Sequence, residues 1–97
     1  MAKINIVFEN NFEDADIISI PDYLLPTIVE IGQKFLNWIP SADDNDYFTI
    51  IAGRQYFVAE TDGFVKWLNT YYCRDTEKAF VVSSHTNICS EYKTLEF

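Results

Sequence analysis

Hydrophobic and polar positions alternate at the start of the chain. In residues 3–9, Ile4, Ile6 and Phe8 are separated by single residues, among them Asn5. This period of two is typical of a strand with one buried face. Residues 9–16 are rich in acid and asparagine, and we expect them to form a loop before the isoleucines at 17, 18 and 20 return the chain to the core.

The clearest helical pattern lies in residues 26–39. The apolar positions are Ile28, Val29, Gly32, Phe35, Leu36 and Ile39, preceded by Leu25. Pro26 suits a first helical turn, and Pro40 cannot continue the helix. The pattern predicts an amphipathic helix whose stripe buries Phe35.

The second half of the chain predicts a hairpin, a helix and two strands. Residues 47–51 and 56–59 are aromatic and β-branched, and the four residues between them include Gly53, which accepts a positive φ. A helix is expected to begin near Thr61 and to run to about Cys73. Residues 78–83 and 92–97 have strand character, the latter as an edge strand.

The resulting order, β-α-β-β-α-β-β, predicts an α+β fold with two helices on one face of a mainly antiparallel sheet of four to five strands. A ferredoxin-like split βαβ arrangement would accommodate the first six elements. A chain of 97 residues predicts a single globular domain spanning 1–97. Six phenylalanines are expected in its core: Phe8, Phe35, Phe48, Phe57, Phe64 and Phe80.

Charge is distributed unevenly along the chain. Residues 1–46 contain nine acidic and two basic side chains, a net charge of −7, whereas residues 47–97 contain six acidic and five basic ones, a net charge of −1. A surface of one sign attracts partners of the opposite sign and repels polyanions. The pattern favours a basic protein partner and argues against nucleic acid and against anionic membranes.

No catalytic, metal or cofactor motif accompanies this charge. His85 and Cys89 have no spacing specific to a nucleophile pair, and no GxSxG sequence surrounds Ser83 and Ser84. A calcium loop starting at Asp43 would require glycine where Phe48 stands. We therefore expect no enzyme activity, no metal and no cofactor.

Two cysteines without a CxxC motif, and no N-terminal apolar leader or long apolar run, indicate a cytoplasmic protein with reduced thiols and no membrane segment. Tyrosines and tryptophans exceed what a small core needs, and these residue types anchor interfaces. We expect partner contacts from three aromatic residues and from two acidic stretches: Trp38, Trp67 and Tyr71, with Glu9, Glu13, Asp14, Asp16, Asp43, Asp44 and Asp46.

The chain resembles bacterial immunity proteins in composition, although it contains no sequence motif specific to them. The resemblance implies an inhibitor that occludes the basic active site of a toxin, one that cleaves nucleic acid or modifies RNA. Two alternatives are a nucleic-acid mimic that blocks a host DNA-binding protein, and a homo-oligomeric accessory module that pairs through its last strand and aromatic surface. Monomer and homodimer are both compatible with the sequence.

Overall fold

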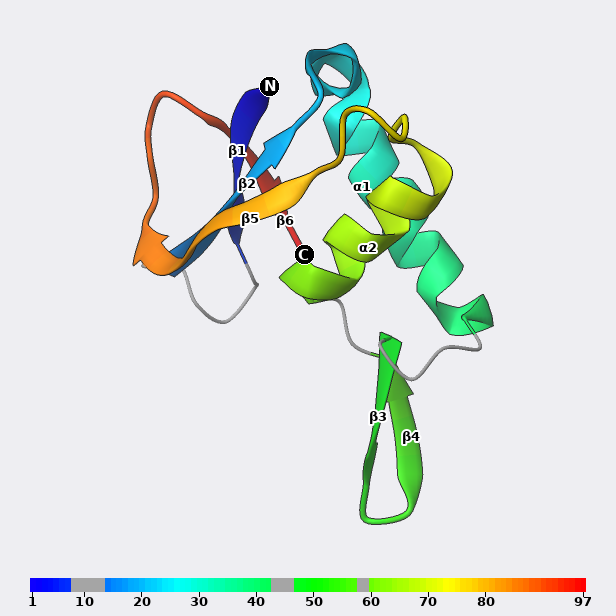
Figure 1. The fold of residues 1–97 in the computed structure, drawn as a ribbon. Coiled ribbons are helices and arrows are strands. Elements are labelled where there is room, and N and C mark those ends of the chain that lie inside the picture. Colours follow the sequence, from blue (N-terminus) through cyan, green and yellow to red (C-terminus); the bar gives the residue numbers. More distant parts are fainter. Residues whose placement is uncertain (8–13, 43–46, 58–59) are drawn as a thin grey trace.

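A computed structural model describes residues 1–7, 14–42, 47–57 and 60–97, and the predicted contact residues Glu9, Glu13, Asp43, Asp44 and Asp46 lie outside these ranges. Within these ranges, two helices and six strands form an α+β fold (Figure 1). The elements are β1 (Ala2–Val7), β2 (Asp14–Ile20), η1 (Asp22–Thr27, a 3-10 helix), α1 (Ile28–Trp38), η2 (Ile39–Ser41, a 3-10 helix), β3 (Phe48–Ile51), β4 (Arg54–Phe57), α2 (Thr61–Tyr71), β5 (Phe80–Asn87) and β6 (Lys93–Glu96).

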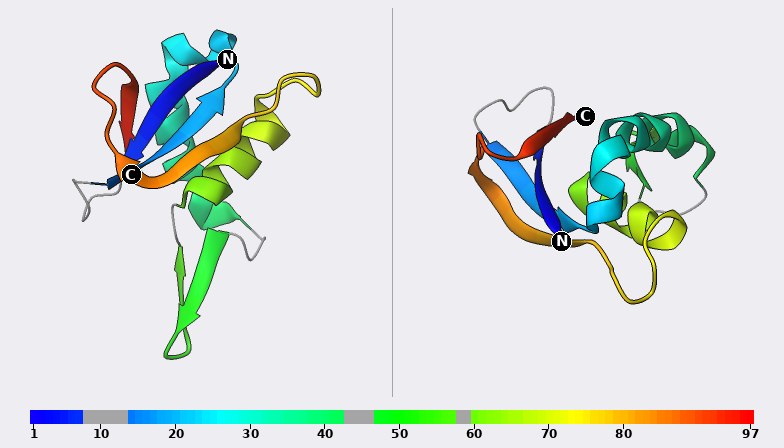
Figure 2. Two further views of the ribbon diagram at one scale, coloured as in Figure 1. Left: turned by 60° about the vertical axis from the view of Figure 1, so that its left-hand side comes forward. Right: turned by 90° about the horizontal axis from the view of Figure 1, so that it is seen from above.

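The four-stranded sheet has the order β5-β2-β1-β6. β1 is antiparallel to β2 but parallel to β6, and β2 is antiparallel to β5. Two of the three pairings are antiparallel, as expected, but the β1–β6 pairing is parallel, so the sheet is mixed. Both helices lie on the same side of the sheet, as the view from above shows (Figure 2). We call this sheet with its two helices the body.

The loop expected over residues 9–16 is wrong at its end, because β2 begins at Asp14. β2 adds a strand to the predicted order, and β3 and β4 form a separate two-stranded sheet, so the ferredoxin-like arrangement is not confirmed. The residues of β2 alternate between the two faces of the sheet, with Asp16, Ile18 and Ile20 on one face. Asp16 is held on that face by hydrogen-bond partners that are distant in sequence.

The helix-facing side of the sheet is isoleucine-rich, and Ile4 and Ile18 are fully buried there. α1 contributes a stripe with Ile28, Ile31 and Phe35, spaced three and four residues apart. Phe35 is buried as predicted, but Val29, which was expected on this stripe, is 50% exposed. Phe35 is the centre of the core. Its ring lies 5.1 Å from that of Phe64, and further rings surround it, those of Trp67, Phe97, Tyr47 and Trp38.

Phe64 is buried as predicted and Phe48 is half-buried, but the prediction for Phe80 is wrong. Phe80 is 53% exposed, while Val81 packs against the core, because the face of β5 is the reverse of the one expected. Phe8 and the side chain of Phe57 lie outside the described part of the chain.

On the other side of the sheet, Asn5 is completely buried. Its amide nitrogen donates to the carbonyl oxygen of Cys89 at 2.8 Å, to that of Tyr92 at 3.3 Å and to the Thr94 hydroxyl at 3.2 Å. Its amide oxygen accepts from the Cys89 N–H at 3.1 Å. One side chain thus ties the β5–β6 connection to the back of β1, which satisfies polar groups that burial would otherwise penalise.

Candidate functional site

Two of the three predicted aromatic contact residues line one open pocket of about 380 Å³. Trp38 comes from the end of α1 and Tyr71 from the end of α2, and their ring centroids are 5.9 Å apart. The other lining residues are Ser41, Ala42, Tyr47, Lys66 and Thr70. We call this the aromatic pocket.

Trp67 supports the pocket from beneath. It is buried, and its ring lies 6.1 Å from those of both Trp38 and Tyr71. The prediction thus brings three residues together, but with different exposures: Trp67 belongs to the core, Trp38 is half-buried and Tyr71 is 61% exposed. Direct contact with a partner is therefore open to Tyr71 and Trp38.

Aromatic faces in this pocket already accept a cation. The Lys66 ammonium group lies 5.8 Å from the centroid of the Tyr47 ring, a distance at which the ring quadrupole attracts positive charge. Ala42 and Tyr47, both pocket-lining residues, flank the stretch that contains Asp43, Asp44 and Asp46 in sequence.

A second hollow, of about 310 Å³, lies where α2 begins. Asp16, Glu60 and Asp62 contribute carboxylates to its lining, together with Thr61, Ser84 and His85. Asp16 is predicted as a partner contact, but both of its oxygens have partners within the fold. One accepts from the Thr61 hydroxyl, and the other accepts from the backbone N–H of His85 at 3.0 Å.

These two bonds fix an irregular stretch of β5. Ala15 pairs with Thr86 and Ile17 with Ser83, so two residues of β5 oppose Asp16 alone. His85 there adopts a left-handed backbone with φ of 53°, which is uncommon for a residue other than glycine. Asp16 is thus a structural residue that holds a β-bulge next to the N-terminus of α2. Asp14 is half-buried at the start of β2 and pairs with Asn87.

The two candidate thiols are partly buried. Cys73 and Cys89 are free, as expected. Burial raises the pKa of Cys73, with smaller opposing effects from a backbone hydrogen bond to Ala79 and from Lys78. Its reactive thiolate is therefore scarce near neutral pH. Among the residues that the structure describes, no three histidine, cysteine or carboxylate side chains gather closely enough to hold a metal ion.

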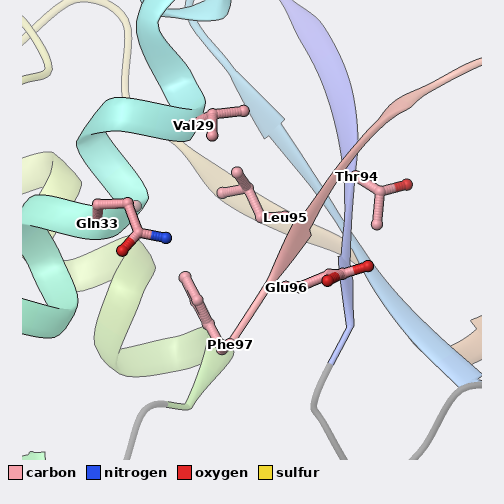
Figure 3. A pocket seen from close by; sticks show the side chains of 7 residues that line it. Val29, Gln33, Thr94, Leu95, Glu96 and Phe97 are labelled. Atoms are coloured by element: carbon pink, nitrogen blue, oxygen red, sulfur yellow. The ribbon is translucent and has the colours of Figure 1, made fainter.

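A third hollow, of about 240 Å³, separates α1 from the edge strand β6 (Figure 3). Val29 and Gln33 line it from the helix, while Leu95 and Phe97 line it from the strand side. Gly32 faces this space, and an added Cβ there would meet Phe97 at 3.5 Å and Leu95 at 3.6 Å. The space exists partly because α1 carries a glycine at this position.

The β3–β4 hairpin exposes three large side chains outside the predicted set of partner contacts. Ile50 is 68% exposed, Ile51 is 59% exposed and Tyr56 is 47% exposed. A signal was present in the sequence: successive strand residues point to opposite faces, so two adjacent isoleucines cannot both lie on one buried face. The hairpin itself was predicted correctly, although its turn contains two residues rather than four.

No family model matches the chain, and neither the curated proteins nor the solved structures yield a match. In the described part of the chain, no helix combines the length and apolar character needed to cross a bilayer.

Proposed function

We propose that this protein is an acidic protein-binding module that inhibits a basic partner, in the manner of an immunity protein that occludes the active site of a toxin. One observation carries the proposal: Trp38 and Tyr71 line an open pocket whose walls, Ala42 and Tyr47, flank an acidic stretch. Aromatic faces suit the arginine or lysine side chains of a basic surface.

The net charge of −8 supports the same class of partner. Long-range attraction raises the rate of encounter with a basic protein, whereas the aromatic residues supply contact area once the two proteins meet. A basic active site of this kind is found in enzymes that act on nucleic acid, because their substrate is a polyanion. Carboxylates of the inhibitor would then occupy the place of phosphates, and a cytoplasmic location belongs to this proposal.

Recovery of the partner tests the proposal. The tagged chain is expressed in cells of its source organism, and each recovered protein is purified and titrated at low and high salt. We expect a basic partner whose association slows as salt rises, since the Debye length falls from about 10 Å at 0.1 M to about 3 Å at 1 M. A neutral or acidic partner, or binding that is insensitive to salt, contradicts the proposal.

Variants locate the contact. Tyr71→Ala removes an exposed ring from the pocket, and the triple change to asparagine at Asp43, Asp44 and Asp46 removes the flanking carboxylates. Each is expected to weaken partner binding by about tenfold or more, as for hot-spot residues and desolvated charge pairs. The matched control neutralises three exposed carboxylates that do not line the pocket, Glu30, Asp75 and Glu91. Equal losses in the control and the test triple would refute a contact at the pocket.

The nucleic-acid-mimic alternative differs only in its target. If the recovered partner is a host DNA-binding protein and its DNA competes with this chain, the nucleic-acid-mimic hypothesis replaces the hypothesis of a toxin inhibitor. Competition by nucleic acid alone does not distinguish the two, because both partners bind polyanions. The distinguishing measurement is whether the partner cleaves or modifies nucleic acid in the absence of this chain and ceases to do so in its presence.

A further inference from the structure

The β3–β4 hairpin stands off the body as a projecting arm (Figure 1). The described side chains of residues 49–56 are all exposed. A two-stranded hairpin without a packing layer is marginally stable in water, and a third strand or another apolar surface is needed to secure it. Exposed Ile50, Ile51 and Tyr56 therefore lack a covering surface within the described part of one chain.

The register distributes these residues over two faces. Ile51 pairs with Arg54 and Thr49 with Tyr56, so these four side chains share one face of the ribbon. Ile50 lies on the other face, opposite Gln55. In the two-stranded sheet, each strand is hydrogen-bonded to the other on one side only. Within the described residues, the hairpin thus offers exposed isoleucine and tyrosine side chains together with open strand edges, features that favour association.

The charge of the hairpin segment indicates which kind of partner would cover it. Residues 47–57 contain no acidic side chain and one basic side chain, Arg54, in a chain whose net charge is −8. Two copies repel each other through their acidic surfaces, so contact is least unfavourable through the segment that lacks acid and projects from the body. A basic partner, in contrast, gains no electrostatic attraction from this segment.

We propose that the hairpin is a self-association arm, and that its occupant is the hairpin of a second copy of this chain. A two-fold arrangement places Ile51 and Tyr56 of one copy against the same face of the other, in the isologous manner of most homodimers. Eight exposed residues from each copy form a smaller contact than the 20 to 30 residues per side of a standard interface. The dimer is therefore weak and depends on concentration.

This inference is independent of the proposed function, because the exposed hairpin residues 49–56 do not line the aromatic pocket. Its experiment uses the purified chain alone. Sedimentation equilibrium is measured from about 5 to 500 µM at about 0.05 M and 0.5 M salt, a range in which the Debye length falls severalfold. We expect a dimer whose dissociation constant is on the order of 100 µM at high salt. It weakens at low salt because repulsion between the acidic bodies is then less screened.

Two variants place the contact. The double variant Ile51→Ser with Tyr56→Ser removes apolar area from one hairpin face, and Arg54→Glu adds acid to both arms without removing that area. The double variant should weaken the dimer by about tenfold or more at both salts. Arg54→Glu should weaken it mainly at low salt, since added charge is screened at high salt.

The control is the double variant Val29→Ser with Val82→Ser, which changes two exposed valines of the body by a similar loss of apolar surface. It should leave the dissociation constant within about twofold of the parent value, as substitutions outside an interface do. A monomer at the highest concentration and at both salts overturns the proposal. A dimer that the valine variant disrupts and the hairpin variants do not also overturns it.

Discussion

The body and the β3–β4 hairpin place the same residue types in opposite environments. Ile4 and Ile18 of the body are completely buried between the sheet and the helices, whereas Ile50 and Ile51 of the hairpin are mostly exposed. Ile4 and Ile18 pair with each other across an antiparallel ladder, and Ile50 and Ile51 likewise pair with residues of β4. Strand formation alone therefore does not bury an isoleucine; burial requires a second layer, which α1 and α2 supply to the body only.

Of the substitutions that test this difference between the body and the hairpin, Phe35→Ala should have the largest effect on stability. Phe35→Ala removes a completely buried ring that has five aromatic neighbours, so it should lower the free energy of unfolding by about 3 to 5 kcal/mol. The matched change in the hairpin, Ile50→Ala, should cost less than about 0.5 kcal/mol. Denaturant unfolding monitored by tryptophan fluorescence measures both. Similar costs at the two positions would show that the hairpin has a packing layer in solution.

A smaller effect is expected at Asn5, where the body depends on a polar side chain. Asn5→Ala leaves the Cys89 N–H and two carbonyl oxygens without their partner, so the free energy of unfolding should fall by about 2 to 3 kcal/mol. Asn37→Ala, on the exposed surface of α1, is the control and should change it by less than about 0.5 kcal/mol. A loss at Asn5 no larger than at Asn37 would mean that water replaces these bonds.

Local patterns predicted the parts of the fold that depend on local physics. The buried Phe35 of α1 and the hairpin at Gly53 follow from spacing and turn chemistry. α2 begins at Thr61 as expected, although its N-cap residue, Glu60, makes no side-chain capping hydrogen bond. β2 was not predicted, because its acidic beginning is typical of a loop. Asp16 lies in a strand because Thr61 and the His85 backbone satisfy its carboxylate, and neither contact is visible in the neighbouring sequence.

The candidate site shows the same division. Residue type identified Trp38 and Tyr71 as contact candidates, and the packing of α1 against α2 brings them into one pocket. The burial of Trp67 could not be predicted, because its stripe on α2 is shared by core and surface residues. For Phe80 the period of two was correct, but alternation alone does not say which face of a strand meets the helices.

A substitution in the hairpin turn tests whether the hairpin opens separately from the body. Ala52 and Gly53 both have positive φ, 52° and 80°, between the paired residues Ile51 and Arg54. Asparagine followed by glycine suits such a two-residue turn, whereas alanine in this region is strained by about 1 kcal/mol. Ala52→Asn should therefore slow amide exchange in the hairpin by about fivefold, with the exchange of α1 unchanged. Equal slowing in both regions would show that they open as one unit.

The smallest expected effect is at Gly32 in α1, the counterpart in the body of Gly53 in the turn. A Cβ at Gly32 would meet Phe97 and Leu95 at ordinary contact distances, in the hollow between the helix and β6 (Figure 3). Because no backbone feature there requires glycine, Gly32→Ala should raise the free energy of unfolding by about 0.5 to 1 kcal/mol through helix propensity. Gly53→Ala should instead destabilise the turn, since its φ of 80° strains any other residue. Thermal unfolding measures the first change, and amide exchange of the hairpin measures the second. A destabilising Gly32→Ala would mean that α1 and β6 lie closer together than these distances, and that the body tolerates added volume no better than its turn tolerates a side chain.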